Sequence, residues 1–229
     1  ADVYPCEAWS SSITTLYPER NFDDLEEADY ILKNLSPAED IRFSYHAIHP
    51  GYVRKTVAEI AIEKNMSQVE MLSSLSSESY ELSQSDSSIE IVIAKGMIDD
   101  DVRQLLNWPY STVCSDGELR CGHPRGCGTF SKVINEYQGV NGLGSLQRVI
   151  HKMTGLSADQ IGIKDRGVIQ KGAFADFILF DPQTMKDHST FTNPALKSEG
   201  VHSVWINGIR VLDNGVHTNK LPGKILIKN

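Results

Sequence analysis

The chain has 229 residues, of which 40% are hydrophobic and 23% are charged, the proportions of an ordinary globular protein. Its formal net charge of −8 argues against nucleic acid as a partner, because nucleic-acid-binding surfaces are basic. No apolar run approaches the roughly 18 residues of a membrane-spanning helix, so we expect no membrane partner.

The first half of the chain is expected to mix helices and strands. Residues 23–35 carry apolar side chains at helical spacing with acidic residues early, which predicts a helix. Ser67, followed three residues later by Glu70, has the spacing of a capping box and predicts a second helix that runs to about Leu75. Residues 8–17 are rich in serine and threonine and are expected to form a loop. The other expected elements are strands over 1–6 and 41–46 and a helix over 52–64.

The rest of the chain begins with a serine-rich stretch and changes to short β-type runs after residue 165. Residues 73–88 are rich in serine and acids and are expected to be a linker, a mobile loop or a poorly packed helix end. Asn207-Gly208 and Asn214-Gly215 separate short β-type runs, which is typical of hairpins. The expected strands are 89–94, 110–114, 175–180, 202–206, 210–212 and 224–227, and the expected helices are 99–106, 129–137, 146–154 and 157–161.

The triplet Ser115-Asp116-Gly117 is the main chemical feature, because it follows the apolar run 110–114 and precedes His123-Pro124-Arg125. A carboxylate at the carboxyl end of a strand, facing a loop, is how a barrel hydrolase places its general base. The same triplet is also a common turn, so by itself it does not decide between the two interpretations.

Taken with their neighbours, these motifs resemble the N-acyl-D-amino-acid deacylases (D-aminoacylases) of the amidohydrolase superfamily. The resemblance begins at Tyr4-Pro5 and Ser10-Ser11 and includes Ser115-Asp116-Gly117 and His123-Pro124-Arg125. Further matching segments are residues 56–61, 128–130, 152–156, 165–167, 172–177, 180–182, 207–208 and 222–223. The chain departs from the family at Cys6 and Trp9, which changes the expected pocket wall.

The resemblance implies an α/β fold: the C-terminal part of a metal-dependent hydrolase (β/α)8 TIM barrel plus part of a small β-sandwich domain. Residues 1–165 would supply the last two barrel strands, with a lid-like insertion at about 8–88, and residues 166–229 the C-terminal β subdomain. The chain opens on Ala1-Asp2-Val3, with neither an initiator methionine nor a signal peptide, so we expect it to be part of a longer polypeptide.

The resemblance also assigns roles to individual residues. Asp116 would be the catalytic base and would share a metal with ligands outside this chain; otherwise it only ends a strand. Arg125 would grip the substrate carboxylate, since a guanidinium binds a carboxylate through two parallel hydrogen bonds; otherwise it is a surface arginine. His123 would help as a donor or would order the loop, and Tyr4 and Ser10 would contact substrate, although Tyr4 also suits core packing.

The implied function is zinc-dependent hydrolysis of the amide bond of N-acyl-D-amino acids, small-molecule substrates. Most zinc ligands would lie upstream, because no His-x-His strand is found here, and the fragment alone would be inactive and prone to self-association. Rival interpretations are an amidohydrolase of cyclic amides, resembling dihydropyrimidinase or hydantoinase, and a non-catalytic binding module.

The four cysteines do not change this picture. They are too few and too irregularly spaced for a disulfide scaffold, which favours reduced thiols in a cytoplasmic enzyme. Cys114, Cys121, His123 and Cys127 lack the tight Cys-x2-Cys spacing of a structural zinc site, so an independent metal site there is not expected.

Overall fold

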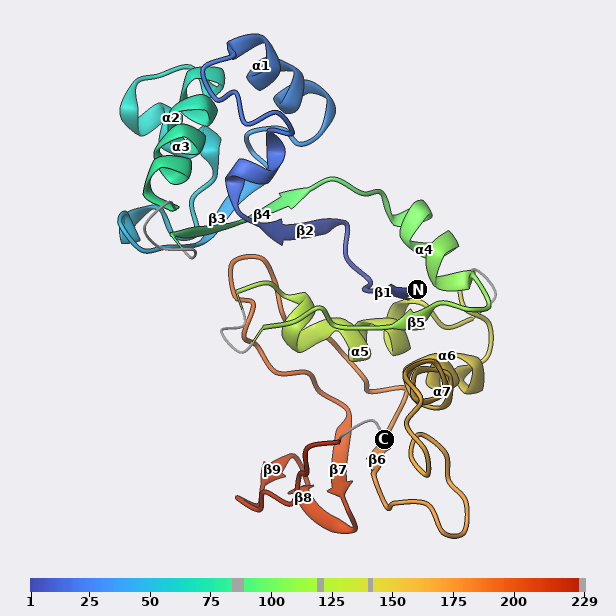
Figure 1. The fold of residues 1–229 in the computed structure, drawn as a ribbon. Coiled ribbons are helices and arrows are strands. Elements are labelled where there is room, and N and C mark those ends of the chain that lie inside the picture. The colour runs from blue at the N-terminus through green and yellow to red at the C-terminus, as the bar shows by residue number, and fades with distance from the viewer. Residues whose placement is uncertain (84–88, 119–121, 140–141, 227–229) are drawn as a thin grey trace. The chain divides into compact units, whose positions relative to one another are not determined.

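The computed structural model describes residues 1–83, 89–118, 122–139 and 142–226. The chain divides into two compact units (Figure 1). Unit 1 consists of Ala1–Pro5 and Asp99–Asn229, and unit 2 is Cys6–Ile98. None of the helices in the described residues has the length and apolar composition needed to cross a bilayer.

Unit 2 is built on a three-stranded antiparallel sheet of order β2-β4-β3, with β4 in the middle. The strands are β2 (Ala8–Ser11), β3 (Ile41–His46) and β4 (Glu90–Lys95). The expectation of a loop over residues 8–17 is wrong, because Ala8–Ser11 pairs with β4 and Ile13–Leu16 forms a 3-10 helix. Strand pairing with β4 therefore outweighs the tendency of a serine-rich segment to form a loop.

The helices of unit 2 begin at caps that the sequence encodes. They are α1 (Leu25–Asn34), α2 (Val57–Lys64) and α3 (Gln68–Ser83), with a short 3-10 turn at Pro50–Tyr52. α2 starts later than expected because Thr56 and Glu59 form a capping box there. The predicted box at Ser67 and Glu70 is confirmed, with the Glu70 amide donating to Ser67 Oγ at 3.2 Å.

α3 continues past the expected end near Leu75 to Ser83, because its serines face the interior. Ser73, Ser76 and Ser79 are buried, and Ser79 Oγ donates to the Glu90 carboxylate at 2.7 Å. Part of the expected linker is thus helix, and its residues 84–88 lie outside the described residues.

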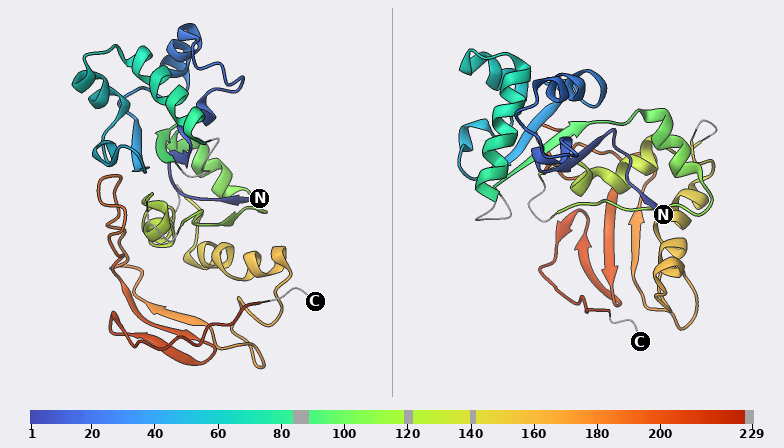
Figure 2. Two further views of the ribbon diagram at one scale, coloured as in Figure 1. Left: turned by 60° about the vertical axis from the view of Figure 1, so that its left-hand side comes forward. Right: turned by 45° about the horizontal axis from the view of Figure 1, so that its top comes forward.

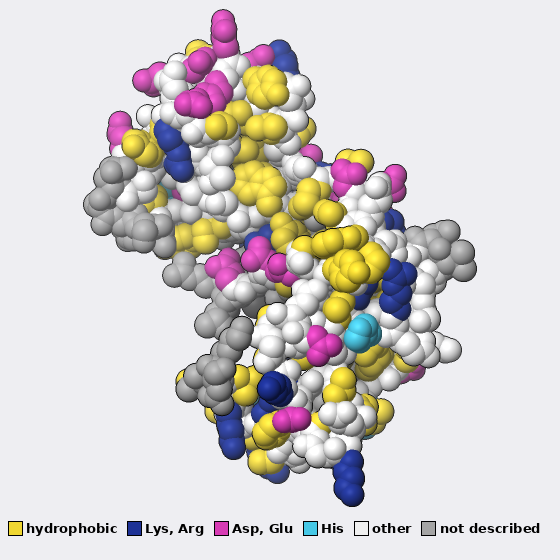
Figure 3. All heavy atoms as spheres, turned by 45° about the vertical axis from the view of Figure 1, so that its right-hand side comes forward, with side chains coloured by type: hydrophobic (Ala, Val, Ile, Leu, Met, Phe, Trp, Pro, Cys, Tyr) yellow, Lys and Arg dark blue, Asp and Glu magenta, His cyan; other side chains and the backbone are white. Residues whose placement is uncertain are grey.

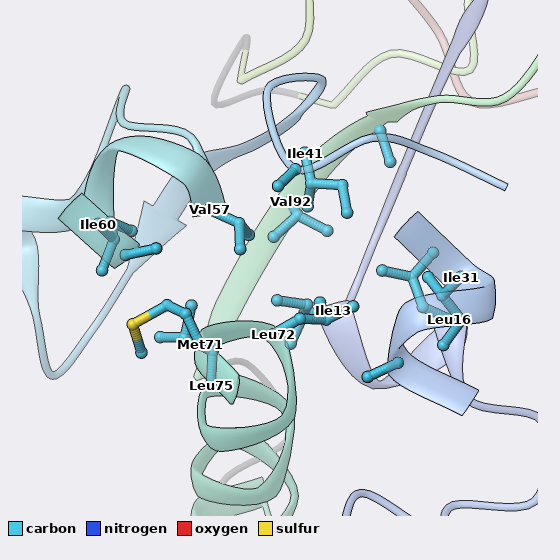
Figure 4. Close-up of a cluster of buried hydrophobic side chains, with 14 of the residues drawn as sticks. Ile13, Leu16, Ile31, Ile41, Val57, Ile60, Met71, Leu72, Leu75 and Val92 are labelled. Carbon is cyan, nitrogen blue, oxygen red and sulfur yellow. The ribbon is translucent and has the colours of Figure 1, made fainter. Parts of the chain in front are cut away.

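The core of unit 2 lies between the sheet and its helices (Figure 4). Ile13, Ile41, Leu72 and Val92 are all fully buried and come from four different elements. Burying each such side chain contributes roughly 1.5–3 kcal/mol, so the unit has a hydrophobic core of its own.

Unit 1 contains a short parallel pair, β1 (Asp2–Val3) and β5 (Thr112–Val113), with Asp2 opposite Thr112. Its helices are α4 (Asp99–Asn107), α5 (Arg125–Glu136), α6 (Leu146–Met153) and α7 (Gly155–Ile161). α5 begins at Arg125 rather than Thr129, so the His123-Pro124-Arg125 motif lies at the helix start.

The rest of unit 1 carries a four-stranded antiparallel sheet of order β6-β7-β8-β9 (Figure 2). Its strands are β6 (Phe177–Phe180), β7 (Val201–Ile206), β8 (Ile209–Asp213) and β9 (Val216–His217). Both Asn-Gly turns are confirmed, with all four residues at positive φ, as tight hairpins require.

The C-terminal end of the sheet differs from the expectation. A strand over 224–227 is wrong for residues 224–226, which are irregular, while residue 227 lies outside the described residues. β9 was not expected, because it is two residues long and follows directly on a turn. Several apolar side chains of β6 stay exposed, Ile178 by 57% and Leu179 by 52%, and hydrophobic side chains are visible on the molecular surface (Figure 3).

Candidate active site

The parallel pairing of β1 and β5 brings two predicted site residues to one edge. The Cys114 amide donates to the Val3 carbonyl at 3.1 Å, which extends the register to the strand ends. Tyr4 follows β1, and Asp116 follows β5. Because parallel strands end at the same edge, both side chains leave the sheet on the same side.

The Asp116 turn depends on two glycines. Asp116 has φ of 43°, in the left-handed region that few residues other than glycine, asparagine and aspartate adopt. A Cβ added at Gly117 would lie 2.6 Å from the Gly126 Cα, a distance too short for real atoms. The turn thus packs backbone to backbone against the start of α5, and this contact directs the Asp116 side chain.

Arg125 connects the turn to the helix. Its Nη2 lies 2.7 Å from Asp116 Oδ2, and its Nε donates to the Asp116 carbonyl at 2.9 Å. The guanidinium carbon lies 4.5 Å from the centroid of the Tyr4 ring, within reach of a cation–π interaction. The Arg125 side chain is only 8% exposed, whereas that of Asp116 is 59% exposed. Arg125 is therefore not a surface arginine, and the carboxylate that it holds faces outward.

His123 is buried and orders the turn before α5. Its Nδ1 accepts a hydrogen bond from the Arg125 amide at 3.0 Å, and its ring lies edge-on to Tyr4 with centroids 6.5 Å apart. Of the two roles expected for His123, this geometry corresponds to ordering the loop. Tyr4, Asp116, His123 and Arg125 thus form one cluster within unit 1.

Ser10 belongs to unit 2. It lies on β2 opposite Ile93 of β4 and is partly buried. Its role in contacting substrate stays a prediction.

The described residues do not assemble a metal site of their own. No three His, Cys, Asp or Glu side chains among them lie together in an arrangement that could hold a metal ion. In the set Cys114, Cys121, His123 and Cys127, Cys121 lies outside the described residues. Burial raises the pKa of the Cys114 thiol to about 11, which opposes formation of the thiolate that binds zinc. Asp116 is one carboxylate, and it is paired with Arg125, so these residues alone do not fit a zinc ion.

The structure adds a contact that the sequence did not predict. Residues 187–198, which join β6 to β7, reach the start of α5, where Ser189 Oγ donates to the Pro124 carbonyl at 3.0 Å. The Phe191 and His123 rings lie edge to face with centroids 5.6 Å apart. This segment has neither helical nor strand periodicity, so no local signal points to the contact.

Comparisons with known proteins identify the family of the chain. Residues 95–212 match the model of an amidohydrolase family. The chain is 41% identical to an N-acyl-D-aspartate deacylase of Alcaligenes xylosoxydans xylosoxydans over 55% of this chain and 26% of that protein. It is 31% identical to an N-acyl-D-glutamate deacylase of the same organism over 98% of this chain and 40% of that protein.

A solved structure gives the same result. The N-acyl-D-glutamate deacylase of Bordetella bronchiseptica, complexed with zinc and a phosphonate mimic of the tetrahedral intermediate, superimposes with a TM-score of 0.71 at 28% identity. The match covers 92% of this chain and 39% of that one. The chain spans two fifths or less of the length of these relatives. The α/β structure of the chain corresponds to part of the fold of these deacylases, and the N-acyl-D-amino-acid deacylases are its relatives. The chain belongs to the amidohydrolase family.

Proposed function

We propose that the protein containing this chain hydrolyses the amide bond of N-acyl-D-amino acids, releasing a carboxylic acid and a free D-amino acid. One observation carries the proposal: an exposed carboxylate, Asp116, and a guanidinium, Arg125, meet at the carboxyl ends of β1 and β5. The named activities of the relatives support it.

Each residue of the cluster has a task in this reaction. Arg125 binds the substrate carboxylate, and the Tyr4 ring beneath the guanidinium keeps it in a fixed plane. Asp116 accepts a proton from the attacking water and returns it to the leaving nitrogen, which departs as an amine. In the ligand-free geometry Arg125 holds Asp116 itself, so the incoming substrate carboxylate competes with Asp116 for the same guanidinium.

Zinc is part of the proposal but not of the steps assigned to this chain. The Bordetella relative is a zinc complex, and a metal contact at Asp116 would provide one ligand. The remaining ligands would come from sequence outside this chain, because the described residues bring no three candidate ligands together.

The wider organisation is proposed on the same basis. Residues 1–165 would belong to a (β/α)8 barrel and residues 166–229 to a small β-sandwich, with the segment of about 8–88 as a lid over the barrel mouth. The separate core of unit 2, inserted in the sequence between β1 and β5, supports a lid that moves as one body.

The exposed apolar side chains of β6 support association with the rest of the longer protein or self-association of the fragment. We propose a cytoplasmic location from the few, irregularly spaced cysteines.

The test is a substrate panel applied to the longer protein. We expect hydrolysis of N-acetyl-D-amino acids, but not of their L-enantiomers, hydantoins or dihydropyrimidines. Turnover of the cyclic amides alone would favour the rival amidohydrolase, and no turnover of any substrate with zinc present would favour a non-catalytic module. The isolated chain supplied with zinc should be inactive, and deacylase activity from it would contradict the proposal.

A further inference from the structure

The connection between β6 and β7 does more than join two strands. Residues 187–198, called here the strap, leave the C-terminal sheet and lie along the first turn of α5. Ser189 Oγ donates to the Pro124 carbonyl at 3.0 Å, and Ser198 Oγ donates to the Cys127 carbonyl at 3.2 Å. The strap is therefore attached to the start of α5 at two points.

The fit between strap and helix is close. A Cβ added at Gly128 would lie 2.3 Å from the Asp187 carboxylate oxygens, so a larger residue there would displace the Asp187 side chain. Asp187 Oδ1 in turn accepts a hydrogen bond from the Ser189 amide at 2.8 Å and lies 2.7 Å from Ser189 Oγ, so the single hydroxyl hydrogen of Ser189 is shared between Asp187 and the Pro124 carbonyl. The first end of the strap is thus held in shape where it meets the helix.

The strap also reaches the site through one aromatic ring. The Phe191 ring meets the buried His123 ring edge to face, with centroids 5.6 Å apart. His123 Nδ1 accepts from the backbone amide of Arg125, and Arg125 holds Asp116. Phe191 itself is 44% exposed, so its replacement by alanine removes the contact with His123 without emptying a fully buried position.

We propose that the strap is a positioning element for Arg125, and that it sets the affinity of the site for the substrate carboxylate. The inference rests on the proposed role of Arg125. Arg125 is the first residue of α5, so any rotation of the His123-Pro124-Arg125 turn redirects its guanidinium. A bidentate guanidinium–carboxylate contact depends on orientation, and a misaligned one loses a large part of its energy.

The experiment uses the longer protein with two strap variants, Phe191→Ala and Ser189→Ala. Phe174→Ala is the matched control, because Phe174 is a similarly exposed ring of unit 1 that packs on Arg166 instead. We expect both strap variants to raise KM for N-acetyl-D-amino acids, Phe191→Ala by about tenfold, with kcat within about twofold of the parent, as loss of uniform binding requires. Amide exchange in residues 122–128 should become faster in both variants and stay unchanged in the control.

The outcomes separate the two proposals. An active parent whose strap variants keep KM within about twofold would overturn the positioning role. A fall in kcat at constant KM in the folded variants would also overturn it, because that pattern indicates the loss of an interaction made only in the transition state. Ser189→Ala removes a single hydroxyl, so it remains informative if Phe191→Ala fails to fold. A parent that hydrolyses no N-acyl-D-amino acid would instead refute the proposed function.

Discussion

Lys152 holds the residues that lead into β5, the strand that precedes Asp116, and replacing it should destabilise unit 1. Its Nζ is buried and donates to the Trp108 carbonyl at 2.6 Å, the Ser111 carbonyl at 2.8 Å and Ser111 Oγ at 3.1 Å. Lys152→Met keeps the length of the side chain but removes this donor. The Trp108 carbonyl still accepts from the Ser111 amide at 3.1 Å, whereas the buried Ser111 carbonyl loses its partner. A buried acceptor that loses its partner costs about 1–3 kcal/mol, so we expect a loss of about 1–3 kcal/mol.

Urea unfolding of the chain, followed by far-UV circular dichroism, measures this loss. With a slope of about 2 kcal/mol/M, the midpoint should fall by about 0.5–1.5 M. The exposed Lys171→Met is the control and should change stability by less than about 0.5 kcal/mol. Amide exchange at Thr112 and Cys114, which pair with β1, should become faster in Lys152→Met. A midpoint equal to that of the control would refute the assignment of Lys152 as the anchor of β5.

Two further predictions concern other parts of the chain. Burial, with His49 nearby, lowers the pKa of His46 below 6.5, so at lower pH the unfolded chain takes up a proton that folded unit 2 refuses. The stability of unit 2 should therefore fall as the pH drops below about 6.5. Urea unfolding at a series of pH values should show a smaller fall in stability for His46→Gln and the same fall for the exposed His151→Gln, a change in unit 1. Gly117→Ala should lower the melting temperature, because its Cβ would meet Gly126 at 2.6 Å, and it should cost about 1–3 kcal/mol. Gly51→Ala, with no atom within 4 Å of the added Cβ, should not lower it, and equal melting temperatures for the two variants would contradict the packing described.

Local chemistry predicted a large part of the fold. The strand Ile41–His46 and the Asn-Gly hairpins follow from side-chain type and turn geometry, which act over a few residues. β2 was missed because its pairing with β4 depends on residues some 80 positions away, which composition does not encode. The full length of α3 was missed for a similar reason, since its buried serines find partners such as Glu90 only in the folded unit.

The candidate site was predicted as residues but not as geometry. The family resemblance named Tyr4, Asp116 and Arg125, and the structure brings them into contact. The sequence did not indicate that Arg125 would pair with Asp116, because both side chains were expected to face a substrate. The contact of Phe191 with His123 was also not predicted, since it joins an irregular segment to the site across 68 residues of chain.

The account depends most on Asp116, and turnover of an Asp116→Asn variant of the longer protein tests it most directly. Asparagine keeps the shape of the side chain but accepts no proton, so kcat for N-acetyl-D-amino acids should fall by about 10²–10⁴-fold. Glu118→Gln, an exposed change in the same loop, should leave kcat within about twofold of the parent. A loss under about tenfold for Asp116→Asn would show that another group carries the proton.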